Sequence, residues 1–131
     1  MDSLEGISVL VVDDDDQSRE VVAAQLQDRH AAVLTASSAA YAFDLLQRER
    51  VDVLLADIGM PHEDGYALIR RLRSSKALAT ASIPAAALTS LARDEDRRQA
   101  LQAGFQLHLA KPIDARSLVA AVVRLGKMHV V

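Results

Sequence analysis

Val51-Asp52-Val53-Leu54-Leu55-Ala56-Asp57 is the stretch that decides the fold, because a short apolar run ends there in a carboxylate. Apolar runs of this length are typical of strands buried on both faces of a parallel sheet. Four such runs end in polar residues: residues 7–12 before Asp13 and Asp14, residues 51–56 before Asp57, residues 83–88 before Thr89, and residues 106–110 before Lys111. The carboxyl ends of parallel strands share one edge, where such sheets bind ligands, so we expect these side chains to lie together.

Helical patterns lie between the apolar runs, and a further short strand is predicted at residues 32–36. The predicted helices cover residues 17–29, a stretch after Ser38, a stretch from residue 64 or 65, residues 93–103, and Asp114 to Gly126. Residues 74–82 are predicted to form a loop of small residues. Parallel strands need such helical crossovers. The sequence therefore predicts one doubly wound α/β domain, with five parallel strands and five helices, over residues 1–131 with a core of about residues 7–126.

The residues at the predicted helix ends suit capping. Asp15 or Asp16 is expected to cap the first helix, since acids favour the positive end of a helix dipole. Ser38 and Asp114 are expected to cap two later helices in the same way. Gly104 is expected to end the helix before it, because glycine adopts the left-handed conformation easily.

Composition narrows the range of functions. With 131 residues, the chain has the length of one domain and can bury a core without disulfides. Only 3% of its residues are aromatic and its net charge is -3, which argues against direct nucleic-acid binding. It contains no cysteine, which excludes disulfides and thiolate metal sites. There is neither a signal-peptide pattern nor an apolar run of about 20 residues, so a cytoplasmic protein without membrane contact is expected.

The acids at the predicted edge suggest a metal site. Asp13, Asp14 and Asp57 would lie within a few ångströms of one another, and such a carboxylate cluster is tolerated when it holds a cation. Oxygen ligands favour a hard ion, and Mg²⁺ suits a site with few carboxylates. The alternative is that the acidic run is a solvated loop and helix cap, a role we assign to Asp15 and Asp16.

The same edge suggests phosphoryl chemistry. Asp57 can act as a nucleophile toward phosphorus, while Lys111 and the Thr89 hydroxyl can bind phosphoryl oxygens. Taken singly, Lys111 is equally an exposed lysine and Thr89 a strand-end residue that bonds local backbone. Their joint occurrence at strand ends favours the functional interpretation. A cis bond before Pro112 would aim Lys111 across the edge, whereas a trans proline would only end the strand.

Taken together, these residues resemble the receiver domain of two-component response regulators. The resemblance runs from Val9 to about Leu125. It is carried by Val11-Val12-Asp13-Asp14, Asp57 with Met60-Pro61 and Asp64-Gly65, Leu88-Thr89, Ala103-Gly104, and Lys111-Pro112. It implies the flavodoxin-like fold with strand order 2-1-3-4-5. The stretch around His108 is most similar to receivers attached to hybrid sensor kinases.

The resemblance also implies a role for each site residue. Asp57 would be the phospho-acceptor, Asp13 and Asp14 would hold Mg²⁺ together with Asp57, and Gly59 would offer its backbone carbonyl to the same ion. Thr89 would be the switch hydroxyl and Lys111 the lysine that bridges to the phosphoryl group. The donor would be the phosphohistidine of a sensor histidine kinase or a histidine phosphotransfer domain. The output, to an unidentified protein or domain, would come from the predicted helix at 93–103, the strand at 106–110 and the last helix. A homodimer is left open.

Two positions depart from the usual receiver pattern. His108 stands three residues before Lys111, where receivers usually have Tyr or Phe, so the aromatic part of the switch rests here on an imidazole that titrates near neutral pH. A plain strand residue is the alternative. Ser90 follows Thr89 where a very small residue is usual, and it still leaves access for a phosphoryl donor.

Two other functions compete with a phosphorylated switch. A Mg²⁺-dependent phosphohydrolase of the haloacid-dehalogenase type would also use an Asp nucleophile, and Asp13-Asp14-Asp15 offers its Asp-x-Asp pattern. That family expects Thr or Val two residues after the second Asp, and Gln17 stands there. The other candidate is a receiver-like module that binds its partner without phosphorylation, which the complete set of site residues argues against. The signalling switch, not an enzyme with turnover, is our prediction.

Overall fold

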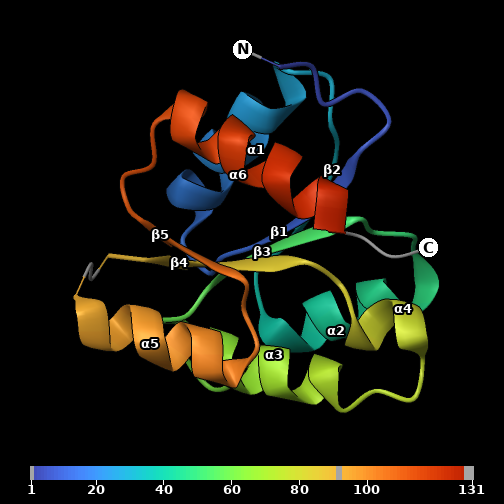
Figure 1. The fold of residues 1–131 in the computed structure, drawn as a ribbon, viewed down its shortest axis with the longest axis vertical. Helices are drawn as coiled ribbons and strands as arrows, with labels where there is room; N and C mark the ends of the chain where they lie inside the picture. Colours follow the sequence, from blue (N-terminus) through green and yellow to red (C-terminus); the bar gives the residue numbers. More distant parts are fainter. Residues whose placement is uncertain (1, 91–92, 129–131) are drawn as a thin grey trace.

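Five parallel strands form the central layer of the computed structural model, which describes residues 2–90 and 93–128 (Figure 1). Their order is β2-β1-β3-β4-β5. The bounds are β1 Ser8–Val12, β2 Ala32–Ala36, β3 Val53–Asp57, β4 Ala85–Thr89 and β5 Leu107–Ala110. All four pairings are parallel. The predicted doubly wound α/β fold is therefore confirmed.

Helices cover both faces of the sheet. One face carries α1, Asp16–Gln27, and α6, Ala115–Met128 (Figure 1, above the sheet). The opposite face carries α2, Ala39–Arg48, α3, Gly65–Arg73, and α5, Asp94–Ala103. A short additional helix, α4, spans Leu78–Ala81. None of the helices among residues 2–90 and 93–128 has the length and apolar character needed to cross a membrane.

The alternation of side chains along the strands divides the core into two layers. In β1, Leu10 and Val12 pack toward α2 and α3, while Val9 and Val11 pack toward α1 and α6. All four are fully buried. Since burying one such side chain stabilises the fold by roughly 1.5–3 kcal/mol, both helical layers are needed to cover the sheet. This explains why the inner strands read as continuous apolar runs.

Most of the predicted helix ends are confirmed. The Asp15 side chain accepts a hydrogen bond from the Gln17 amide and caps α1, and Ser38 caps α2 by accepting from the Tyr41 amide. Gly104 ends α5 with a φ of 129°. The prediction that Gly126 ends the last helix is wrong, because α6 continues to Met128.

The physical reason for the longer helix is the backbone conformation of Gly126. A glycine ends a helix when it adopts the left-handed conformation, as Gly104 does with a φ of 129°. Gly126 is not among the glycines of the described residues that have a positive φ, so the helical path continues through it at a cost of about 1 kcal/mol relative to alanine. A Cβ at Gly126 would lie 3.5 Å from Ile7 Cδ1, so the helix backbone packs close to the segment before β1.

Part of the predicted loop at residues 74–82 is helical, which adds α4 to the five predicted helices. The Ala81 amide donates to the Ala77 carbonyl at 2.9 Å, and the Ser82 amide donates to the Leu78 carbonyl at 3.0 Å. No side chain caps this helix at Ala77. A single turn of this length is too short to produce a hydrophobic period, so the sequence carries no signal for it.

Candidate functional site

The carboxyl ends of β1 and β3 bring two acids together at the centre of the sheet edge. Val12 pairs with Ala56 in the β1–β3 register, and the next residue on each strand is an aspartate, Asp13 and Asp57. The strand order reverses at β1, which lies between β2 and β3. Ligands bind at such switch points in open α/β sheets. The parallel register therefore accounts for the position of the site.

Three carboxylates form the acidic cluster predicted from the sequence. Asp13, Asp14 and Asp57 each offer an oxygen, and these oxygens lie within 4.8 Å of one another. Asp13 is fully buried and Asp57 is 9% exposed, whereas Asp14 is exposed. At this separation, two negative charges repel by about 3 kcal/mol at an effective dielectric constant near 20. Oxygen donors in a cluster of this charge are the ligands that Mg²⁺ prefers.

Lys111 offsets part of this negative charge. Its Nζ lies 2.7 Å from Asp13 Oδ2 and 3.5 Å from Asp57 Oδ2. The other oxygen of each carboxylate accepts a backbone hydrogen bond of 3.0 Å, Asp13 Oδ1 from the Asp15 amide and Asp57 Oδ1 from the Gly59 amide. Each of the two acids is thus held between a backbone N–H and the same ammonium group.

The environment shifts the pKa values of these groups in different directions. Burial opposes ionisation of Asp13, but hydrogen bonds from Lys111, the Asp15 amide and Ser18 outweigh it and hold its pKa below the ordinary value. Burial raises the pKa of Asp57, against the opposing effects of the Gly59 amide and Lys111. Burial lowers the pKa of Lys111, but both carboxylates outweigh it and raise that pKa above the ordinary value. The ionised form of Asp57 is thus disfavoured by its surroundings, and a bound cation would favour it.

The raised pKa of Asp57 makes a prediction about stability in metal-free protein. The pKa of Asp57 is higher in the folded than in the unfolded protein. The free energy of unfolding therefore falls as the pH rises from the unfolded-state pKa to the folded-state pKa, and above the folded-state pKa the whole loss of stability is present. We expect Asp57→Asn to be more stable than the parent at about pH 7 with EDTA, and to lose this advantage toward about pH 4. Urea unfolding at both pH values measures it. A variant less stable than the parent at neutral pH would contradict the prediction.

Thr89 and Lys111 approach the cluster from the next two strands. Thr89 is the last residue of β4 and is 4% exposed. The Lys111 amide donates to the Thr89 carbonyl at 2.7 Å, which ties the end of β5 to the end of β4. The Lys111–Pro112 bond is cis. The structure therefore brings Asp13, Asp14, Asp57, Gly59, Thr89 and Lys111 to one edge, as the sequence predicts.

His108 lies away from the acids, in the middle of β5. It pairs with Ala87 on the face of the sheet that α5 covers. Burial lowers the pKa of its imidazole, Asp96 opposes that shift and Arg97 adds to it. Its Nε2 atom is buried and has no hydrogen-bond partner in the described part of the chain. A switch role for His108 therefore stays a prediction, for a half-buried imidazole on the strand next to Thr89.

Arg19 contributes to the site although nothing in the sequence singled it out. Its Nη1 donates to the backbone carbonyl of Asp13 at 2.8 Å, and its Nη2 pairs with Asp16 Oδ1 at 2.6 Å. An arginine on a polar helix face is ordinarily a surface residue. The only sequence feature that could have pointed to Arg19 is its position six residues after Asp13. Arg19 lies near the beginning of α1, and from there its guanidinium reaches back to the residue that follows β1.

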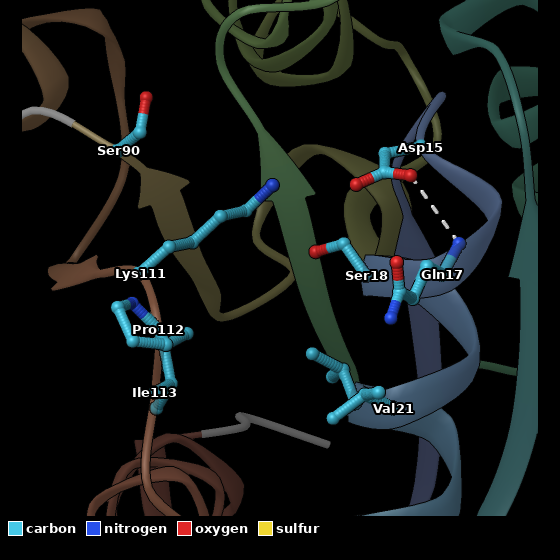
Figure 2. A pocket seen from close by; sticks show the side chains of 9 residues that line it. Asp15, Gln17, Ser18, Val21, Ser90, Lys111, Pro112 and Ile113 are labelled. Atoms are coloured by element: carbon cyan, nitrogen blue, oxygen red, sulfur yellow. Dashed lines mark hydrogen bonds between the residues drawn. The ribbon is translucent and has the colours of Figure 1, made fainter.

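A groove of about 440 Å³ opens beside the acidic cluster (Figure 2). It lies between the start of α1 and the segment that follows β5. Val21, Pro112 and Ile113 give it an apolar lining, and Val21 is 50% exposed. Ser90 and Lys111 line it as well, and Figure 2 shows the Lys111 side chain extending across the strand ends toward α1. The groove therefore connects an apolar surface with the charged edge.

A family model identifies the class of protein that this fold and site define. The model for the response regulator receiver domain matches residues 9–123. The chain therefore belongs to the receiver domain family of two-component signalling. Receiver domains are signalling switches that bind Mg²⁺ at an acidic site, and the Asp13, Asp14 and Asp57 cluster is of that kind.

Individual relatives support the same assignment. An uncharacterized 14.6 kDa protein in the sodA1 3′ region of Leptolyngbya boryana is 42% identical over 122 residues, which cover 93% of this chain and 92% of that protein. The hybrid signal transduction histidine kinase D of Dictyostelium discoideum is 31% identical over 128 residues, which cover 93% of this chain but 8% of the kinase. That match supports the resemblance to receivers of hybrid kinases.

A solved structure extends the comparison to the site. The receiver domain of sensor histidine kinase PA1611 from Pseudomonas aeruginosa PAO1, with a magnesium ion coordinated in its active site cleft, is 30% identical to this chain. Its TM-score is 0.84, and the match covers 93% of this chain and 98% of that one. The flavodoxin-like receiver fold is thus shared over nearly the whole chain.

Proposed function

We propose that this receiver domain accepts a phosphoryl group on Asp57, in a Mg²⁺-dependent reaction, from the phosphohistidine of a sensor histidine kinase or a histidine phosphotransfer domain. The observation that carries the proposal is the position of Asp57. Its carboxylate is held by the Gly59 amide at 3.0 Å and lies 3.5 Å from the Lys111 ammonium, within the acidic cluster. A nucleophile, a cation and a metal-binding set of acids are the groups that phosphoryl transfer needs.

In the proposed reaction, an Asp57 carboxylate oxygen attacks the phosphorus atom of the phosphohistidine. The P–O bond forms as the P–N bond breaks, the electron pair of that bond stays on the imidazole nitrogen, and the product is an acyl phosphate on Asp57. Lys111 and the Thr89 hydroxyl each bind a phosphoryl oxygen.

The metal would be held by Asp13, Asp14, Asp57 and the Gly59 carbonyl. Bound there, Mg²⁺ supplies positive charge that reduces the repulsion between the carboxylate and the phosphoryl oxygens. The donor set fits this ion, because it is built from oxygen atoms and leaves an uncompensated negative charge beside one lysine.

The groove beside Lys111 is suited to the donor protein. A phosphohistidine must approach Asp57 from solvent, and the groove gives it an apolar surface next to the charged edge. Val21, Pro112 and Ile113 would contact apolar side chains of the donor. A small phosphodonor needs none of these contacts.

Phosphorylation would change the surface formed by α5, β5 and α6. Thr89 lies at the end of β4, where its hydroxyl can turn toward the phosphoryl group, and His108 lies on the neighbouring strand against α5. Displacement of Thr89 would open room for the His108 imidazole to move inward. An output protein or domain would bind to the changed surface.

Intact-mass spectrometry tests the proposal. The parent protein is incubated with acetyl phosphate, with Mg²⁺ or with EDTA, and the modified residue is located by peptide mapping after hydroxylamine cleavage of the acyl phosphate. We expect one phosphoryl group per chain, only with Mg²⁺, on the peptide that contains Asp57. Binding of beryllium fluoride without any adduct would indicate an acyl phosphate that hydrolyses quickly.

Two further results separate the competing functions. A module that binds its partner without phosphorylation would give neither an adduct nor a beryllium fluoride complex. A phosphohydrolase of the haloacid-dehalogenase type would turn over small phosphate esters in a separate incubation with Mg²⁺, where we expect the esters to remain intact.

A further inference from the structure

We infer that Arg19 is a positioning residue for the metal site, because its guanidinium fixes the peptide group between Asp13 and Asp14. The inference rests on the proposed Mg²⁺ site. It assigns a role to a side chain that touches neither the metal nor the phosphoryl group. Arg19 would act indirectly, by fixing the peptide plane from which the Asp14 side chain extends.

The carbonyl of Asp13 needs a donor from outside the sheet. Val12 is the last residue of β1 that pairs with either neighbouring strand, so Asp13 lies one residue beyond both ladders. Its amide still donates to the Ala36 carbonyl at 3.1 Å, but its own carbonyl accepts from Arg19 Nη1 at 2.8 Å. Buried backbone carbonyls are almost always hydrogen-bonded, and here a side chain supplies the bond.

Arg19 is itself well anchored. Its backbone amide donates to the Asp15 carbonyl at 3.0 Å, in the first turn of α1. Its Nη2 pairs with Asp16 at 2.6 Å, and its side chain is only 16% exposed. The planar guanidinium uses two of its nitrogen atoms for partners three residues apart, which restricts its orientation.

The consequence concerns Asp14, the exposed member of the cluster. The Asp13 carbonyl and the Asp14 amide belong to one rigid peptide plane, so fixing the carbonyl fixes the start of Asp14. Asp13 is already held at both carboxylate oxygens, by Lys111 and by the Asp15 amide. Asp14 has no hydrogen bond or ion pair within the residues that the structure describes. The peptide plane is therefore the main restraint on where its carboxylate points.

The direction in which the Mg²⁺ affinity changes when Arg19 is replaced distinguishes a positioning role from a purely electrostatic one. Removing the positive charge of Arg19 makes the site more negative, which by charge alone would tighten Mg²⁺ binding. Loss of positioning would weaken it. Partners that orient metal ligands typically change metal affinity by 10-fold or more, so we expect Arg19→Met to raise the Kd for Mg²⁺ by about 10-fold.

The test is a calorimetric titration of the phosphate-free protein with Mg²⁺. The parent is compared with Arg19→Met, Arg19→Lys and the control Asp16→Asn, which breaks the ion pair but leaves the bond to Asp13. We expect a smaller loss for Arg19→Lys than for Arg19→Met. The control should change the Kd by less than about threefold, since an exposed ion pair contributes little. Thermal unfolding without metal shows which variants are folded.

Each outcome decides the inference. If Arg19→Met binds Mg²⁺ as tightly as the parent, or more tightly, Arg19 does not position the site. If that variant is unfolded, Arg19→Lys decides, because it keeps the charge and any loss of affinity must come from geometry. Unchanged affinity in Arg19→Lys would then overturn the inference. A parent that binds no Mg²⁺ would instead overturn the proposed metal site, and the inference with it.

Discussion

Asp57→Asn is expected to abolish the gain of a phosphoryl group from acetyl phosphate in the presence of Mg²⁺. The amide of Asn has nearly the shape of the carboxylate but is not a nucleophile at neutral pH. Asp57 is the acid of the cluster that is both partly accessible and close to the Lys111 ammonium, since it is 9% exposed and lies 3.5 Å from Lys111 Nζ. Complete loss, measured by intact mass under conditions that fully modify the parent, is the predicted result.

The other two acids of the cluster cannot replace Asp57. Asp13 is fully buried, and both of its carboxylate oxygens are occupied. Asp14 is exposed, but the Lys111 ammonium forms its ion pairs with Asp13 and Asp57, so it would not be in place to bind a phosphoryl group on Asp14. Residual phosphorylation of Asp57→Asn at the rate of the parent would show that another residue is the acceptor.

Asp64→Asn is the matched control for this prediction. It makes the same chemical change seven residues later in the chain, at the N-cap of α3. Asp64 accepts a hydrogen bond from the Ala67 amide at 2.8 Å, and Asn caps helices about as well as Asp. We expect this variant to be modified as fully as the parent. A loss in both variants would point to damage of the loop after β3 rather than to loss of the nucleophile.

The sequence predicted the site largely because the parallel register is regular. Once residues 7–12 and 51–56 are taken as neighbouring parallel strands, Asp13 and Asp57 must end them side by side, and Val12 does pair with Ala56. The same reasoning placed Thr89 and Lys111, since Thr89 pairs with Ala110. The spacing of apolar residues and the points at which the apolar runs end can both be read from short stretches of the chain, so these positions could be inferred without coordinates.

The features that were missed depend on tertiary contacts. Arg19 reaches the Asp13 carbonyl from the beginning of α1, six residues later in the chain, and this contact depends on how α1 is placed after β1. α6 continues through Gly126 because this glycine does not take the positive φ that Gly104 takes at the end of α5, and the residue type alone does not decide between the two. The turn of α4 at Leu78–Ala81 is too short for a period, and Leu78 is 79% exposed. None of these three features follows from the hydrophobic pattern of the sequence alone.

Gly65→Ala is expected to destabilise the domain strongly, because the added methyl group would overlap the backbone at the end of β3. A Cβ at Gly65 would lie 2.6 Å from the Asp57 carbonyl oxygen and 2.8 Å from Ile58 Cα. Both contacts are with backbone at the end of β3, which cannot rotate away. Gly65 is thus the point where the first turn of α3 packs directly on the end of β3, the strand that carries Asp57.

We expect Gly65→Ala to lower the free energy of unfolding by about 2–3 kcal/mol, as overpacking of a tight contact usually does. For a domain of this size the loss corresponds to a fall in Tm of about 10 °C. The clash also displaces the Asp57 carbonyl, so the folded fraction should bind Mg²⁺ more weakly than the parent. Urea unfolding and calorimetric titration at a temperature where the variant is folded measure the two effects separately.

Gly59→Ala provides the comparison, because the same methyl group is added two residues after Asp57. There the nearest heavy atom to a new Cβ is Asp57 Oδ1 at 3.6 Å, an ordinary van der Waals distance. Since alanine also restricts the unfolded chain more than glycine does, we expect a change in stability within about 1 kcal/mol, toward higher stability. Equal stability of Gly65→Ala and Gly59→Ala would mean that the start of α3 can move away from β3, and that Asp57 is held by Gly59 and Lys111 rather than by this helix–strand contact.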